Sequence, residues 1–80
     1  MKHAREDYNR FQDPENKIPV DEPVFLLRGQ DIMAPMTLRH WAHSMLDARK
    51  YDIALLAFKQ ADAMEKWQEV GKGQRKIADL

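Results

Sequence analysis

The sequence contains no cysteine and has no excess of charge of either sign. The lack of cysteine excludes disulfides, thiolate chemistry and cysteine-based zinc sites, and it fits a reducing cytoplasm. Thirteen basic residues balance thirteen acidic ones, so no whole-molecule field attracts the protein to nucleic acid or to an anionic membrane. General nucleic-acid binding is therefore disfavoured.

Long apolar runs are also missing from the sequence. No stretch approaches the ~20 apolar residues that a helix needs to cross a bilayer, and the start MKHARED lacks the apolar core of a signal peptide. We therefore expect a cytoplasmic protein with no membrane partner. A chain of 80 residues fits one domain with a thin core. Because disulfides are excluded, we expect additional stability from a homo-oligomer, a dimer or higher.

Prolines and polar residues dominate the first part of the chain. Pro14, Pro19 and Pro23 prevent any long regular element there, and the surrounding residues are polar and slightly acidic. We predict an N-terminal polar arm over residues 1–22 and a single domain over residues 23–80.

A continuous apolar run, Val24 to Leu27, follows Pro23 and predicts a strand that is covered on both faces. A single strand leaves its backbone groups without partners, so it must pair with another segment. The candidates are residues 18–20, a strand after residue 70, or the same strand in another subunit. We favour self-pairing between subunits.

Two amphipathic helices are predicted after this strand. The first spans about residues 35–49 and is preceded by Asp31 as a candidate cap. The second spans about residues 53–70, with Asp52 as its cap and Gly71 just beyond its end. Apolar residues at helical spacing predict the core, which comprises Leu38, Trp41, Ala42, Met45 and Leu46 of the first helix and Ile53, Leu56, Ala57, Ala61, Met64 and Trp67 of the second.

Leu55 and Phe58 lie on the other side of the second helix, so its first two turns are apolar nearly all round. We expect this face, together with the strand, to form the contact between subunits. The predicted fold class is α+β and mostly α, with a short N-terminal strand followed by an αα-hairpin in a homo-oligomer.

The turn after the strand is the strongest candidate for a binding site. Arg28 stands beside Gly29, which allows unusual backbone conformations and close approach to a ligand, and Gln30 and Asp31 follow. An arginine near the N-terminus of a helix suits phosphate or carboxylate binding. The simpler alternative is a turn glycine, a capping aspartate and an arginine that is paired with an acidic residue.

Four residues of the predicted helices complete the candidate ligand site. Gln60 stands within the apolar stripe of the second helix, where its amide needs a partner, either a protein group or a ligand. Trp41 and Trp67 are able to stack on a base, although core packing accounts for both. Arg39 is a second candidate contact for an anion.

His40, His43 and Asp47 share one face of the first helix at spacings of three and four. Such a set suggests a divalent metal, but a solvated helix face is the better explanation, and the zinc-protease spacing is missing. His40, Ser44 and Asp47 on the same face suggest a hydrolase. One exposed helix face, however, provides neither oxyanion donors nor a pocket. We therefore expect neither an enzyme nor a cofactor.

The segment EPVFLLRGQDIMAPMTLRHWA, residues 22–42, resembles the core of small, largely uncharacterised phage and prophage proteins. The shared pattern is EPVFxLRxxDxxAPxxxRxWA. The resemblance implies a phage-encoded protein in the host cytoplasm. By analogy it suggests an anti-defence sponge that holds a nucleotide immune signal between subunits.

Two functional hypotheses follow. The first is a non-enzymatic protein that sequesters an anionic, nucleotide-like small molecule, such as a cyclic nucleotide or an ADP-ribose derivative, at a subunit interface. The second is a helical protein-interaction module that docks on a host protein and inhibits it.

Overall fold

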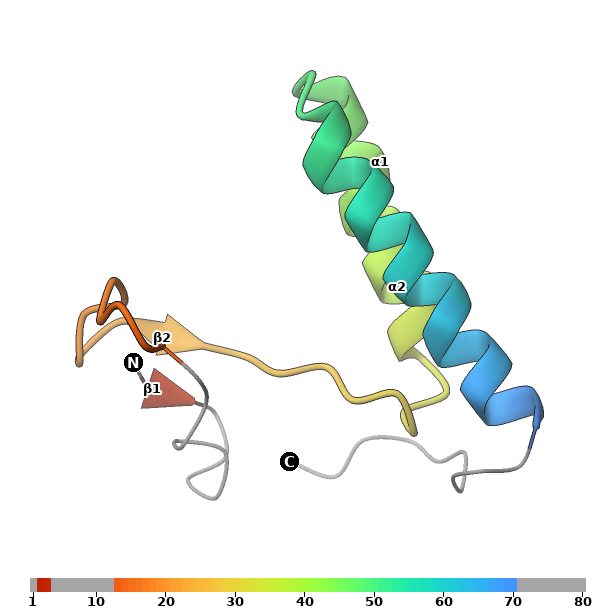
Figure 1. Ribbon diagram of the computed structural model, residues 1–80, viewed down its shortest axis with the longest axis horizontal. Coiled ribbons are helices and arrows are strands. Elements are labelled where there is room, and N and C mark those ends of the chain that lie inside the picture. The colour runs from red at the N-terminus through yellow and green to blue at the C-terminus, as the bar shows by residue number, and fades with distance from the viewer. Residues whose placement is uncertain (1, 4–12, 71–80) are drawn as a thin grey trace.

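The computed structural model describes residues 2–3 and 13–70 (Figure 1). The elements are strand β1 (Lys2–His3), strand β2 (Pro23–Val24), helix α1 (Ala34–Asp47) and helix α2 (Tyr51–Glu69). The two helices pack against each other as a hairpin, and an extended segment joins the short strands to α1 (Figure 1). The mostly helical class and the αα-hairpin are therefore confirmed. Residues 4–12 of the predicted arm and Gly71 lie outside the described residues.

Strand β2 is shorter than the sequence predicts. It pairs in parallel with β1, with Lys2 opposite Pro23, and the Lys2 N–H donates a 2.6 Å hydrogen bond to the Glu22 carbonyl. This partner was not among those predicted. The expectation that both faces of the run are covered is wrong, because Phe25 is exposed. An apolar run indicates burial but does not identify the backbone groups that pair with it.

Helix α1 begins directly after a turn that Asp31 organises. The Asp31 carboxylate accepts a 2.8 Å hydrogen bond from the Met33 N–H, and the Asp31 carbonyl accepts a 3.0 Å bond from the Ala34 N–H. Met33 occupies the cap position, and no side chain caps the helix. Asp31 therefore stabilises the turn before the helix, as aspartate often does, and is not the cap itself.

The connection between the helices is a Schellman motif centred on Arg49. The Lys50 N–H donates to the Met45 carbonyl at 2.8 Å, and the Arg49 N–H donates to the Leu46 carbonyl at 2.9 Å. Arg49 has a φ of 61°, in the left-handed region where glycine is usual. Because this turn is tight, α2 begins earlier than predicted and Asp52 lies in its first turn.

Small residues form the contact between α1 and α2. The buried apolar residues of the helices are Ala34, Pro35, Ala42, Ala54, Ala57 and Ala61. Alanines at successive turns allow close approach of the helix axes, so bulky side chains are displaced to the flanks. The predicted core positions of Trp41, Ile53 and Leu56 are therefore wrong, because these side chains are 45%, 46% and 68% exposed.

Phe58 belongs to the contact between the helices and not to an outer face. Its ring packs edge-on against His43, with ring centroids 5.1 Å apart and planes at 84°. Leu55 is exposed, as its position away from the predicted core stripe implies. Of the two residues predicted to contact another subunit, Phe58 packs on α1 and Leu55 remains exposed.

Candidate functional site

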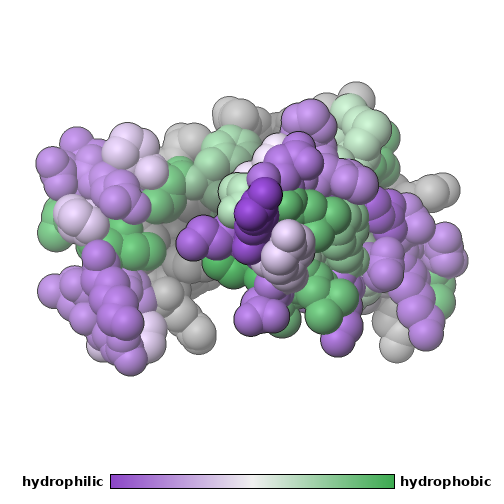
Figure 2. All heavy atoms as spheres, turned by 90° about the horizontal axis from the view of Figure 1, so that it is seen from above, coloured by the Kyte–Doolittle hydropathy of each residue, from purple (hydrophilic) through white to green (hydrophobic). Residues whose placement is uncertain are grey.

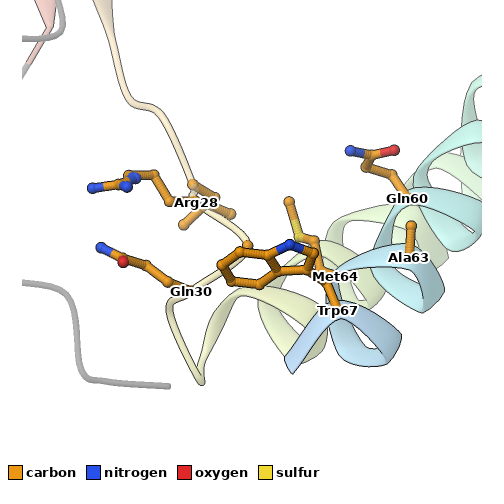
Figure 3. A pocket seen from close by; sticks show the side chains of 8 residues that line it. Arg28, Gln30, Gln60, Ala63, Met64 and Trp67 are labelled. Carbon is orange, nitrogen blue, oxygen red and sulfur yellow. The ribbon is translucent and has the colours of Figure 1, made fainter. Parts of the chain in front are cut away.

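An open cleft of about 470 Å³ lies between the turn before α1 and the last three turns of α2 (Figure 3). Its lining comprises Leu27, Arg28, Gly29 and Gln30 from the turn, and Gln60, Ala63, Met64 and Trp67 from α2. Five of the eight residues that the sequence assigns to a ligand site therefore line one cleft. They come from segments some thirty residues apart in the chain.

The side-chain amide of Gln68 holds the turn against α2. Its Nε2 donates hydrogen bonds to the carbonyls of Gly29, at 2.8 Å, and Asp31, at 2.9 Å. Gln68 and Asp31 are the buried polar residues of the described chain. A buried amide that bonds two main-chain carbonyls keeps their positions fixed relative to the helix. The wall of the cleft that carries Arg28 is therefore anchored at both sides of Gln30.

Gly29 faces the side chains of α2 at ordinary contact distance. A Cβ atom placed on it would lie 3.8 Å from Met64 Cγ and 3.9 Å from Trp67 Cε3. Its φ lies outside the left-handed region, so the expectation of an unusual backbone conformation at this glycine is wrong. The turn closes through the hydrogen bond from the Asp31 N–H to the Arg28 carbonyl at 3.0 Å.

The polar groups of the cleft are spread around the indole of Trp67. In Figure 3 the side chains of Arg28 and Gln30 extend in the same direction from the turn, and Gln60 lies on the other side of the indole. Among the residues that line the cleft in the described part of the chain, Arg28 is the one with a charged side chain. The described lining therefore combines a cation, two amides and an aromatic ring.

Three predicted site residues lie outside this lining. Asp31 is buried and its carboxylate is bonded to the Met33 N–H. Trp41 lies on α1, and Arg39 contacts the opposite flank of α2. Asp31 falls outside because its carboxylate is bonded within the turn, and Arg39 because its guanidinium is bonded to acidic residues of α2.

Arg39 bridges the two helices through acidic partners. Its guanidinium donates to Glu65 Oε2 at 2.9 Å and to Asp62 Oδ1 at 2.8 Å. These hydrogen bonds, first to Glu65 and then to Asp62, raise the pKa of Arg39 above its ordinary value. The guanidinium of Arg39 therefore forms a cross-helix ion pair outside the cleft lining, and its role as an anion contact stays a prediction.

The sequence predicted that Gln60 is a buried amide that needs a hydrogen-bond partner, but Gln68 is the glutamine in that position. Gln60 is exposed at the cleft, whereas Gln68 is buried and makes the two bonds to the turn. A signal for Gln68 was present, because it follows the buried residues Ala57 and Ala61 by eleven and seven positions. Those spacings place it on the same side of α2.

The histidine face of α1 shows no metal geometry. Within residues 2–3 and 13–70, no three or more histidine or acidic side chains gather closely enough to hold an ion. His43 packs on Phe58, and the Ser44 hydroxyl donates a 3.3 Å hydrogen bond to the His40 carbonyl one turn earlier. Neither helix of the described chain has the length and apolar character that a membrane crossing requires.

Comparison with protein-family models finds no matching family, and comparisons with curated proteins and with solved structures find no significant match.

Proposed function

We propose that this protein binds and sequesters an anionic, nucleotide-like small molecule in the cleft between the Arg28 turn and α2, without catalysing a reaction. The observation that supports the proposal is the convergence of Arg28, Gln30, Gln60 and Trp67 on one cleft. Such a set matches the parts of a nucleotide, because phosphate, base edge and base face each have a suitable protein group.

Each role follows from the chemistry of its side chain. Arg28 offers a planar guanidinium that bonds two phosphate oxygens together. Trp67 offers an aromatic face, on which stacking of a base is worth about 1–3 kcal/mol. Gln30 and Gln60 have both donors and acceptors for the edge of a base or for ribose hydroxyls.

The size and shape of the cleft agree with such a ligand. A volume of about 470 Å³ lies within the usual range for small-molecule sites. In Figure 3, Arg28 and Gln30 lie on one side of the Trp67 indole and Gln60 on the other, and we propose that the ligand lies along the indole between them. The cleft is open to solvent on one side, and we propose that a second subunit of a homo-oligomer covers it.

The resemblance to phage proteins that the sequence of residues 22–42 suggests supports a biological context for the proposed binding. We propose a phage-encoded protein of the host cytoplasm that removes a nucleotide immune signal, such as a cyclic nucleotide or an ADP-ribose derivative. Sequestration requires binding groups and no catalytic group, and Arg28, Gln30, Gln60 and Trp67 are binding groups of this kind.

Isothermal titration against a panel of cyclic nucleotides and ADP-ribose derivatives tests the proposal. We expect one member of the panel to bind, and Arg28→Ala to weaken that binding at least tenfold because the cation is lost. Arg49→Ala is the matched control, since Arg49 lies in the connection between the helices and does not line the cleft. No heat of binding from any member of the panel, or equal binding by wild type and Arg28→Ala, would refute the proposal.

The exposed apolar side chains favour a second candidate function, a helical module that docks on and inhibits a host protein. Trp41, Ile53 and Leu56 are exposed large apolar residues that a binding partner would cover. Pull-down from host lysate with wild-type protein and with Leu56→Glu separates the two functions. Docking is favoured if a host protein is recovered stoichiometrically with wild type but not with Leu56→Glu, and if no member of the titration panel binds.

A further inference from the structure

Helix α2 carries two overlapping apolar seams, each with the alternating three-and-four spacing of a coiled coil. The first seam faces α1 and comprises Ala54, Ala57, Ala61, Met64 and Gln68, which are buried or half-buried. The second seam begins one residue earlier and comprises Ile53, Leu56, Gln60, Ala63, Trp67 and Val70, all of which are exposed. This spacing is the one at which side chains of a helix pack into holes on a second helix.

Residues of α1 extend the second seam across the hairpin. Arg39 bonds to Asp62 and Glu65, and these contacts define a charged flank of the hairpin. Trp41 lies about 160° around α1 from Arg39, so it belongs to the opposite flank, where the second seam of α2 also lies. Figure 2 shows an apolar area of this kind over the helices, bordered by hydrophilic residues.

The hairpin has little apolar burial of its own. No large side chain of the described chain is fully buried, and the contact between the helices is built from alanines. Alanine contributes little apolar area, whereas the uncovered Trp41, Ile53 and Leu56 would contribute much more. The described chain therefore leaves several large apolar side chains of this face exposed to solvent.

We infer that the second seam of α2 is a dimer interface, on which α2 of a second copy of this chain packs around a two-fold axis. The three-and-four spacing of the seam fits a partner helix with the same spacing. Helix α2 of a second copy has this spacing. A two-fold axis brings identical surfaces together, so every copy supplies the partner that every other copy needs. The formal net charge of zero produces no repulsion between copies.

The size of the face agrees with this occupant. Two packed helices are about 20 Å wide, and the second seam from Ile53 to Val70 is about 25 Å long. Two such faces together bury on the order of 1,000 Å², the lower size of specific protein interfaces. Gln60 lies near the middle of the seam, where a single polar residue selects the register of a helix pair at some cost in stability.

The interface and the proposed ligand cleft share Gln60, Ala63 and Trp67. A second α2 on the seam therefore borders the cleft and covers part of its open side. This consequence rests on the proposed function, but the dimer itself does not. Mass and proximity are measured without any ligand, so a failed titration leaves the dimer inference intact. A monomer would remove the proposed covering subunit but not the lining that this chain provides.

Native mass spectrometry and light scattering at micromolar concentration test the interface. We expect wild-type protein at twice the chain mass and Leu56→Glu at the chain mass, because a charge would be buried in the seam. Leu55→Glu is the matched control, since Leu55 is comparably exposed but lies about 100° away around α2. It should remain a dimer, and helical circular dichroism should show that both variants are folded.

Cross-linking gives a second measurement that does not depend on disruption of the seam. The chain has no cysteine, so Leu56→Cys and Leu55→Cys each introduce one thiol. A short bismaleimide should join two copies through Cys at position 56 in high yield and through position 55 in low yield. A monomeric wild type, or equal cross-linking at both positions, would overturn the inference, as would recovery of a different protein on the seam.

Discussion

Gln68 and Gly29 are joined by a 2.8 Å hydrogen bond from the buried side-chain amide to the main-chain carbonyl. The same amide reaches the carbonyl of Asp31 at 2.9 Å. Thirty-seven and thirty-nine residues separate the partners along the chain, so the bonds connect the turn before α1 to the last turn of α2. The Arg28 turn has its place beside α2 because of this contact.

Replacement of Gln68 by alanine should destabilise the fold. Two carbonyls would lose their donor in a buried environment, which costs about 1–3 kcal/mol. Urea unfolding followed by circular dichroism measures the change. Gln60→Ala is the matched control, because Gln60 is exposed and its loss should change the free energy of unfolding by less than about 0.5 kcal/mol. Equal effects of the two variants would contradict the assigned role of Gln68.

Replacement of Gly29 by alanine should be tolerated. The new Cβ meets Met64 and Trp67 at ordinary contact distances, and the backbone conformation is open to any residue. The variant restricts the unfolded chain, so the free energy of unfolding should rise by about 0.4–1 kcal/mol. A loss of more than about 1 kcal/mol in urea unfolding would show that the turn requires glycine after all.

Replacement of Arg49 by glycine should stabilise the hairpin. Arg49 has a φ of 61°, and this conformation costs an L-residue about 1–2 kcal/mol that glycine does not incur. Part of the gain is offset by the greater freedom of glycine in the unfolded chain, so a net gain of about 0.5–1 kcal/mol is expected. Arg49→Ala keeps the strain and should show no gain. A melting temperature lowered by Arg49→Gly would contradict the Schellman interpretation.

The contribution of Arg39 to stability should not depend on pH near neutrality. Its pKa is raised by Glu65 and Asp62, so its stabilisation is fully present below the unfolded pKa and is lost only as pH rises through the still higher folded pKa. The difference in free energy of unfolding between wild type and Arg39→Gln should therefore stay constant from about pH 7 to about pH 9. A difference that shrinks across this range would argue against the raised pKa.

The sequence predicted the two helices to within about two residues at their ends because helical apolar spacing and Pro35 agree. It placed Arg28, Gln30, Gln60 and Trp67 in one candidate site, and the fold brings these residues to one cleft. It did not predict the pairing of β2 with Lys2–His3, because two-residue strands have no periodicity to detect.

The sequence by itself determined that the first two turns of α2 are apolar nearly all round and that no disulfide supports the small core. Only the tertiary structure decided which of two overlapping seams faces α1. Helical periodicity specifies directions around an axis but not which direction meets the neighbouring helix. The alanine seam allows the closer approach of the two axes, so Ala57 and Ala61 became core while Leu56 remained exposed.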